Sequence, residues 1–196
     1  MPLTDQPLRS LLDAFASPDP TPGGGSASAL ASSVGASLLV MVASLPKTRH
    51  NTDEERAALA AASAALATIR AALTDAIDAD TAAYDAVVAA YRLPKTTDAE
   101  KQTRQAAVQR ALKGATDVPL GVMRRSADAL RHATAIATYG FPAAASDVGV
   151  ARALLGAGLA GARLNVEINL GSIRDESYAA AVRAEVERLT SANPGA

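Results

Sequence analysis

The sequence predicts an all-α fold: a bundle of about five to six helices that includes a long antiparallel pair and a buried central helix. Hydrophobic residues make up 49% of the chain but aromatic residues only 3%, so the core must consist of Ala, Leu and Val side chains. Apolar residues recur every three or four positions, which is the helical period, and no segment alternates as a strand does. We expect one domain over residues 1–196.

The helix boundaries follow from apolar spacing and from the Pro and Gly positions. Pro119 is expected to interrupt or kink one helix, and Ser146 is expected to cap another. The loop at residues 47–50 is basic and is expected to be solvated; the alternative is that it binds a polyanionic ligand tail. The expected helices are Leu3 to Ala16, the glycine loop to about Leu45 with a stop at Pro46, Asp53 to Tyr91, residues 103–138, residues 146–170 and Arg174 to Leu189.

The second helix has no charged residue between Thr21 and Pro46. This stretch is long enough to span a bilayer, so a membrane helix is one interpretation. Six serines, an opening Pro-Gly-Gly-Gly and the absence of flanking aromatic residues favour the other interpretation, a helix buried all round within a helical protein. We therefore expect no membrane partner.

Gly23, Gly24 and Gly25 precede this helix, with Ser26 directly after them. A glycine loop at a helix N-terminus offers unpaired backbone N–H groups to an anionic or electron-rich ligand. The loop lacks the Lys-Ser/Thr of a P-loop and does not follow a strand, so neither nucleotide motif fits. The alternative is a flexible entry to the helix with no ligand.

One acidic residue lies on the apolar side of the long helix. The inward-facing series contains Asp80, whereas Asp78 and Asp85 lie off it and are expected to be ordinary solvated acids. Burial raises the pKa of a carboxyl group toward the range useful for proton transfer. The alternative is a structural carboxylate that caps a neighbouring helix or pairs with Lys or Arg. The series is Leu66, Ile69, Leu73, Ile77, Asp80, Tyr84, Val87 and Tyr91.

On the fifth predicted helix, Asp147, Asn165 and Asn169 share a stripe with small residues. The two amides could bind a ligand, but buried Asn side chains more often satisfy backbone groups.

Composition excludes several classes of function. A net charge of −1 provides no field that would recruit nucleic acid. The chain has no cysteine, and its two histidines, His50 and His132, form no zinc motif, so we expect no metal site. The first 17 residues show no secretory signal, and we expect a cytoplasmic protein.

Six segments, in order along the chain, resemble the formiminotransferase-cyclodeaminase C-terminal domain family, which includes cyclodeaminases and methenyltetrahydrofolate cyclohydrolases. The resemblance implies an all-α homodimer and a tetrahydrofolate substrate. It also implies a reaction at the N5/N10 one-carbon bridge, either cyclodeamination or hydrolysis, with no metal or redox cofactor. The segments are PGGGS at 22–26, DADTAAY at 78–84, YRLPK at 91–95, VPL at 118–120, SDVGVA at 146–151, and GA at 161–162 with NVEINL at 165–170.

The family's catalytic aspartate falls on Asp80, the residue that the apolar spacing also selects. The resemblance further suggests that the glycine loop and Ser26 hold substrate and that Lys95 meets its glutamate carboxylates. It also suggests that the pterin ring forms hydrogen bonds with three further residues: Asp147, Asn165 and Asn169. Phe141 stands where the family commonly has Asn, which could alter the reaction or the preferred folate. The alternative is a catalytically silent dimeric folate-binding or scaffold protein.

Overall fold

All regular secondary structure is helical within residues 1–45 and 51–193, which are the residues that the computed structural model describes. The predicted all-α fold is thus confirmed. The expected stop at Pro46, the basic loop at 47–50 with His50, and the last three residues lie outside the described residues. In order, the elements are the 3₁₀ turn η1 (Leu3–Asp5), α1 (Leu8–Ala16), α2 (Gly24–Ser44), α3 (Asp53–Tyr91), α4 (Asp98–Tyr139), the 3₁₀ turn η2 (Pro142–Ala144), α5 (Ala145–Leu170) and α6 (Glu176–Ser191).

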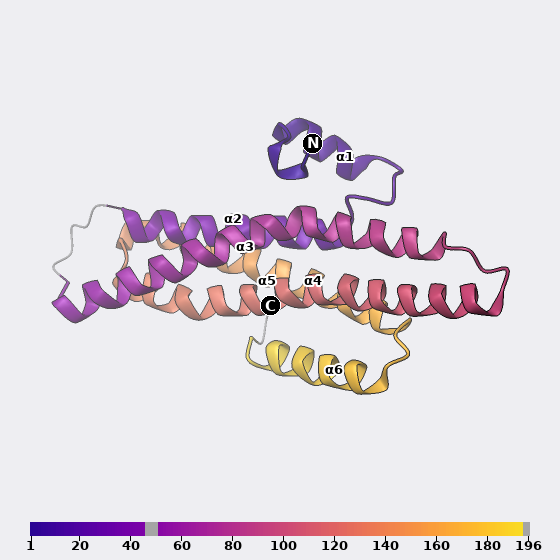
Figure 1. Ribbon diagram of the computed structural model, residues 1–196. Coiled ribbons are helices and arrows are strands. Elements are labelled where there is room, and N and C mark those ends of the chain that lie inside the picture. Colours follow the sequence, from indigo (N-terminus) through magenta and orange to yellow (C-terminus); the bar gives the residue numbers. More distant parts are fainter. Residues whose placement is uncertain (46–50, 194–196) are drawn as a thin grey trace.

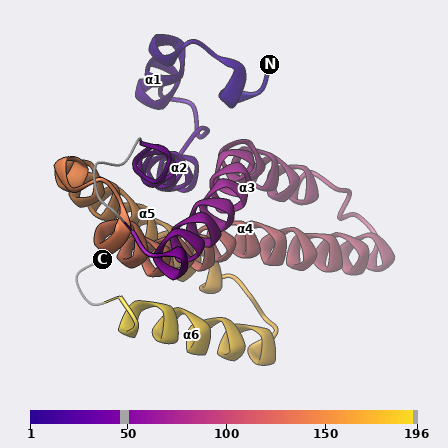
Figure 2. The ribbon, with the colours of Figure 1, turned by 90° about the vertical axis from the view of Figure 1, so that its left-hand side faces the viewer.

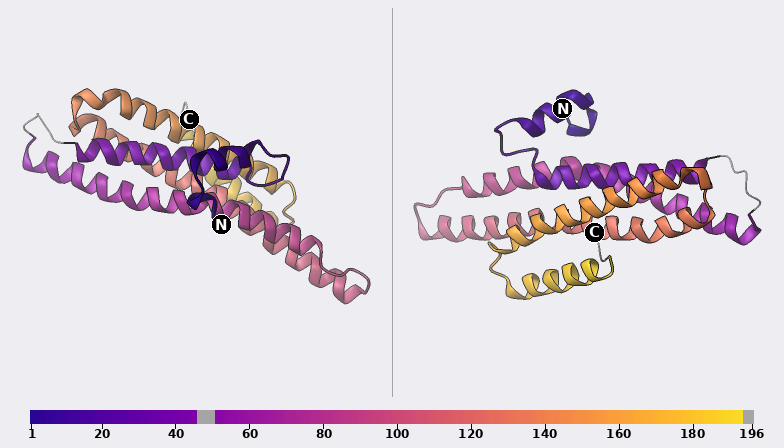
Figure 3. Two further views of the ribbon diagram at one scale, coloured as in Figure 1. Left: turned by 90° about the horizontal axis from the view of Figure 1, so that it is seen from above. Right: turned by 180° about the vertical axis from the view of Figure 1, so that it is seen from behind.

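Four helices, α2 to α5, form an elongated bundle (Figure 1), with η1 and α1 on one side of it and α6 on the other. Seen from the end, the α3–α4 hairpin extends away from α2 and α5 (Figure 2). Seen from above, the far end of this hairpin projects past the N-terminal end of α2 (Figure 3). The end of α2 that carries the glycine loop therefore meets the middle of α3 rather than its end.

Small residues bring α2 and α5 into close antiparallel contact. A Cβ added to Gly158 would lie 1.9 Å from Ser32 Oγ, and one added to Gly161 would lie 2.4 Å from Ser28 Oγ. The central helix is confirmed, but the expectation that it is buried all round is wrong. Its outer side exposes 43% of Val34 and 40% of Met41, because no other element of the described chain covers that side.

The long helix α3 begins at a capping box between Thr52 and Glu55. The predicted inward series is confirmed from Leu66 to Ile77, whose members are buried. It is wrong further on, where Tyr84 and Tyr91 are 40% and 48% exposed. The reason is geometric: α2 starts beside the middle of α3 and leaves the last turns of α3 uncovered (Figure 3).

Pro119 lies inside a single continuous helix, α4, so of the two predicted outcomes, an interruption or a kink, the interruption is wrong. Proline has no N–H, and the carbonyl of Ala115, four residues earlier, loses its normal donor within the helix. The side chain of Asn169 on α5 replaces that donor, because its Nδ2 lies 2.8 Å from Ala115 O. The side-chain amide of the neighbouring helix thereby allows α4 to continue as a helix beyond the proline.

The N-terminal segment differs from the single helix predicted over Leu3 to Ala16. It divides into η1 and α1, since Pro7 starts a new helix and cannot donate a backbone hydrogen bond. Asp78 is not simply solvated: it accepts hydrogen bonds from the backbone N–H of Leu3 and from the Thr4 hydroxyl, the latter at 2.7 Å. This carboxylate therefore attaches η1 to α3.

Two helix starts also differ from the predictions. The fifth helix begins at Ala145, so Ser146 lies within its first turn and is not its cap. The last helix begins at Glu176 rather than Arg174, because Asp175 caps it by accepting a hydrogen bond from Tyr178 N at 3.0 Å.

Three helical stretches are long and apolar enough to cross a membrane when judged by length and composition alone: Gly24–Ser44, Asp53–Tyr91 and Pro142–Leu170. In the first of them, Ser26 and Ser32 are fully buried and hydrogen-bond to other helices of the bundle. These contacts attach one side of α2 to its neighbouring helices.

Candidate active site

The start of α2 meets the middle of α3 at Asp80. The Oδ2 atom of Asp80 accepts a hydrogen bond from Ser26 N at 2.9 Å and lies 3.1 Å from Ser26 Oγ. Ser26 is the third residue of α2, so its N–H has no partner within the helix, and Gly23 at the N-cap has no side chain that could supply one. Asp80 therefore caps α2 from a neighbouring helix, which is the structural alternative considered for this residue.

The second carboxylate oxygen of Asp80 faces the glycine loop. Within residues 1–45 and 51–193, the hydrogen bonds found for Asp80 all end on Oδ2. A Cβ added to Gly25 would lie 2.1 Å from Oδ1, so the carboxylate occupies the space that any other residue at position 25 would fill. One oxygen is thus fixed by the cap, and the other has no hydrogen-bond partner found among the described residues.

Burial raises the pKa of Asp80 above the ordinary value of a carboxyl group. The hydrogen bonds from the Ser26 hydroxyl and amide oppose this rise without cancelling it. A raised pKa moves the carboxyl group toward the range in which a general acid/base can both take and return a proton. Capping and acid/base chemistry are compatible here because they use different oxygens.

The structure brings Asn165 to the same place from α5. A Cβ added to Gly24 would lie 3.4 Å from Asn165 Nδ2, and this amide donates to Gly161 O at 2.9 Å. Asn169 lies one turn further along and donates to Ala115 O, as described above. Each Asn therefore satisfies a backbone carbonyl, and only Asn165 lies against the glycine loop.

Asp147 lies far from this cluster within one chain. It is 18 residues before Asn165 on the same helix, a separation of roughly 27 Å at 1.5 Å per residue. Phe141 lies at the same distant end, partly buried against the core, next to Gly140, whose added Cβ would lie 3.3 Å from Val42 Cγ1. Neither residue can contact a ligand held against Asp80 of its own chain without spanning the bundle.

Lys95 is exposed at the tip of the α3–α4 hairpin and lines a groove of about 520 Å³. The sequence pointed to Lys95 alone. Three other cations of the groove were missed, because they come together only in the folded chain and share no spacing in the sequence. Tyr91, which also lines the groove, is three helical turns from Asp80 on the same side of α3, or about 16 Å. Besides Lys95, the cations that line the groove are Lys101, Arg104 and Arg174.

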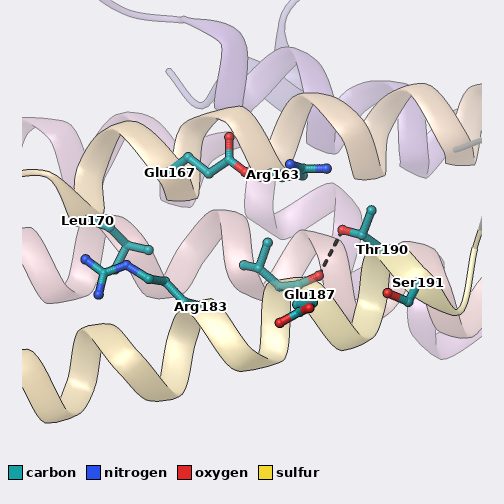
Figure 4. A pocket seen from close by; sticks show the side chains of 8 residues that line it. Arg163, Glu167, Leu170, Arg183, Glu187, Thr190 and Ser191 are labelled. Atoms are coloured by element: carbon teal, nitrogen blue, oxygen red, sulfur yellow. Dashed lines mark hydrogen bonds and ion pairs between the residues drawn. The ribbon is translucent and has the colours of Figure 1, made fainter.

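A separate cavity of about 290 Å³ lies between α5 and α6 (Figure 4). Its charged side chains include an ion pair between Arg163 and Glu167 at 2.6 Å. None of the predicted site residues lines it, so we do not place the chemistry there. Within the described chain, no group of three His, Cys, Asp or Glu side chains could hold a metal ion.

The family model described as formiminotransferase-cyclodeaminase matches residues 7–188. The chain belongs to this family. Among its members, the methenyltetrahydrofolate cyclohydrolase of Methylorubrum extorquens is 40% identical over 94% of this chain and 89% of that one. The formimidoyltransferase-cyclodeaminase of Sus scrofa is 33% identical over 95% of this chain, which spans only 35% of that protein.

A solved family structure agrees with the architecture. The formiminotetrahydrofolate cyclodeaminase of Thermotoga maritima superposes with a TM-score of 0.84 at 26% identity, covering 96% of this chain and 90% of that one. The family resemblance predicted from the six segments is therefore confirmed. The roles of the individual site residues remain predictions, supported by the geometry around Asp80.

Proposed function

We propose that this chain is a folate one-carbon enzyme acting on the N5/N10 bridge of tetrahydrofolate, with Asp80 as its general acid/base. The observation that carries the proposal is the Asp80 carboxyl group, fixed through Oδ2, free at Oδ1 and raised in pKa beside a glycine loop. Hydrolysis is favoured, because the cyclohydrolase relative is similar over nearly the whole of both chains. Cyclodeamination is the second candidate, because the similar solved structure carries that name.

Both reactions need the same proton movements. In hydrolysis, Asp80 takes a proton from the water that attacks the methenyl carbon and returns it to the ring nitrogen as the bond between that nitrogen and the carbon breaks. The second proton of the water is released to solvent, and a formyl group remains on the other nitrogen. In cyclodeamination, N10 attacks the formimino carbon, Asp80 takes the N10 proton, and a proton goes to departing ammonia. Gly23, Gly24 and Gly25 let the folate approach Oδ1, and Asn165 borders the same space.

The methenyl bridge absorbs light, so one spectrophotometric assay separates the candidates. Purified protein is mixed with 5,10-methenyltetrahydrofolate in one cuvette and with 5-formiminotetrahydrofolate in another. Enzymatic loss of absorbance in the first identifies a cyclohydrolase, and a gain in the second with release of ammonia identifies a cyclodeaminase. No enzymatic change of absorbance in either cuvette, with folate binding retained, would support the alternative of a catalytically silent binding or scaffold protein.

Asp80→Asn is the matched control because Asn keeps the size of the side chain and can still accept the hydrogen bond from Ser26 N. We expect this variant to fold and to lose turnover. Near-normal turnover would remove Asp80 from the mechanism. We further propose that no cofactor or metal beyond the folate is required, and dialysis against a chelator should leave the rate unchanged.

Lys95 and the three cations beside it are proposed to receive glutamate carboxylates of the substrate tail. The groove is net positive along its lining, although Lys101 is paired with Asp98 at 2.8 Å. Lys95→Gln should raise KM more for a folate with several glutamates than for one with a single glutamate. The exposed Arg70→Gln, on the same helix hairpin, is the control and should leave both KM values unchanged.

A homodimer is proposed because α2 and α5, which contact each other within the chain, expose apolar side chains that no other described element covers. On α5, 65% of Leu164 and 74% of Ile168 are exposed, and on α2 the exposed Val34 and Met41 recur at one face. A second copy of the chain is the occupant that the family resemblance implies, and we propose neither a membrane nor nucleic acid as a partner. Light scattering in detergent-free buffer should give twice the monomer mass, whereas a protein that requires detergent would support the membrane interpretation.

We propose a cytoplasmic location, in keeping with a chain of 196 residues that has no cysteine to form disulfides. Fractionation of the native cells with an antibody would test it.

A further inference from the structure

The Ser26 hydroxyl has two obligate acceptors within 3.1 Å for one proton, besides a longer contact of 3.5 Å with Thr81 Oγ1, in which either hydroxyl can donate. Its Oγ lies 2.8 Å from the carbonyl oxygen of Ile77 and 3.1 Å from Asp80 Oδ2. A hydroxyl group has a single hydrogen to donate, and a backbone carbonyl can only accept. The contacts with Ile77 and with an ionised Asp80 therefore compete for the same hydrogen and cannot both be full, linear hydrogen bonds at the same moment.

The conflict disappears if the hydrogen on Ser26 turns as Asp80 changes its protonation state. When Asp80 is ionised, the hydroxyl donates to Oδ2. When Asp80 is protonated at Oδ1, Oδ2 is a neutral carbonyl oxygen and a weaker acceptor, so the hydroxyl donates to Ile77 O instead while Ser26 N–H still holds Oδ2. Ser26 is fully buried, so water has no access that would let it perform the same exchange.

We propose that Ser26 is a positioning residue that follows the proton of Asp80 and holds the carboxyl group in one place through both halves of the catalytic cycle. The proposal rests on the proposed function and changes the role first suggested for Ser26. Its amide and hydroxyl are already engaged with Asp80 and Ile77, and its buried side chain presents no polar atom to a folate. Substrate contact at this end of α2 then falls to the glycines.

The proposal makes a prediction about Asp80 that needs no substrate. Ser26→Ala removes the hydroxyl that stabilises the ionised carboxylate but keeps the backbone N–H. The pKa of Asp80 should rise by roughly one unit, the size expected for losing one hydrogen bond to a charged group. Charged side chains contribute none of the identified causes of the shift at Asp80, so no neighbouring ion should mask the change.

The measurement is a ¹³C NMR titration of protein labelled at the Asp side-chain carboxyl groups, with the Asp80 signal assigned by its loss in Asp80→Asn. Ser33→Ala is the matched control, because Ser33 is also a buried serine on α2 that bonds to α3, through Thr74 Oγ1 at 2.7 Å, without contact to Asp80. The control should titrate as the wild type does. Ser26→Cys, with a weaker donor, should give a smaller rise and serves if Ser26→Ala does not fold.

The same variants are then assayed for turnover against pH. We expect the acidic limb of the Ser26→Ala profile to move upward with the NMR titration, by about the same interval. A folded Ser26→Ala or Ser26→Cys in which Asp80 titrates at the wild-type pKa would overturn the proposal. If the NMR titration moves and the limb of the activity profile does not, Ser26 follows the proton as proposed but Asp80 is not the acid/base, and the proposed function fails instead.

Discussion

Gly25→Ala tests the site through a single methyl group. The added Cβ would lie 2.1 Å from Asp80 Oδ1 and 2.5 Å from Cγ, whereas ordinary contact begins near 3.4 Å. Helix α2 is packed closely against α5 and cannot move aside, so the side chain of Asp80 must shift by more than about 1 Å. A displacement of that size at an acid/base group costs roughly 100-fold in rate, which is about 2.7 kcal/mol of activation free energy.

The free energy of unfolding should change much less. Displacing Asp80 breaks its hydrogen bonds with Ser26, a loss of about 1.5–3 kcal/mol for bonds to a charged group. Alanine in place of glycine within a helix returns about 0.5–1 kcal/mol. The net destabilisation is then about 1–2 kcal/mol, which leaves a folded protein with a defective site.

Two other glycines provide a graded comparison. Gly114→Ala on α4 meets nothing within 4 Å and should raise stability slightly with no effect on turnover. A Cβ at Gly24 lies 3.4 Å from Asn165 Nδ2, so Gly24→Ala should cost little stability while it narrows the space proposed for the folate. The assay is loss of methenyl absorbance, with thermal unfolding followed by circular dichroism. Gly25→Ala that folds and turns over at the wild-type rate would refute the placement of Oδ1 as the reacting oxygen.

Three further predictions concern the packing and the electrostatics. Burial raises the pKa of Asp80, so the stability that the protonated carboxyl group contributes is present below pH 3.8 and is lost as the pH rises through the pKa of Asp80 in the folded protein. The melting temperature of Asp80→Asn should therefore exceed that of the wild type at neutral pH and equal it in acid. Asn169→Ala should cost about 1–3 kcal/mol in chemical denaturation, and the cost should shrink when Pro119→Ala restores the helix donor, as a double-mutant cycle would show. Gly158→Ala would place a Cβ 2.7 Å from the backbone carbonyl of Ser28, which cannot swing aside, so a loss of about 3 kcal/mol or more is expected from the unfolding midpoint.

Apolar periodicity was sufficient for the helices and for selecting Asp80. The series from Leu66 to Ile77 follows the helical period, and a carboxylate on that series is recognisable because charges are costly in such positions. The same periodicity failed at Tyr84 and Tyr91, since a spacing pattern does not show where the covering helix starts. Only the position of α2 along α3 decides which part of the series is buried.

The partners of polar groups were beyond the reach of the sequence. Pro119 signals a helix break by its chemistry, yet Asn169, distant by 50 residues, supplies the missing donor. Asp78 lies off the apolar series but binds η1, because a 3₁₀ turn that precedes it by more than 70 residues folds back onto α3. In both cases the deciding contact is between segments remote in sequence, which local patterns do not encode.

The close contact of α2 with α5 also limits how these helices can change over evolutionary descent. Ser32 and Gly158 share the space of one small side chain, and so do Ser28 and Gly161. A larger residue on either helix requires a smaller one opposite, so substitutions at these positions should be inherited as pairs, while single replacements should be removed by selection. Because the glycine loop is the next turn of the same helix, drift in this contact would also move the backbone that faces Asp80.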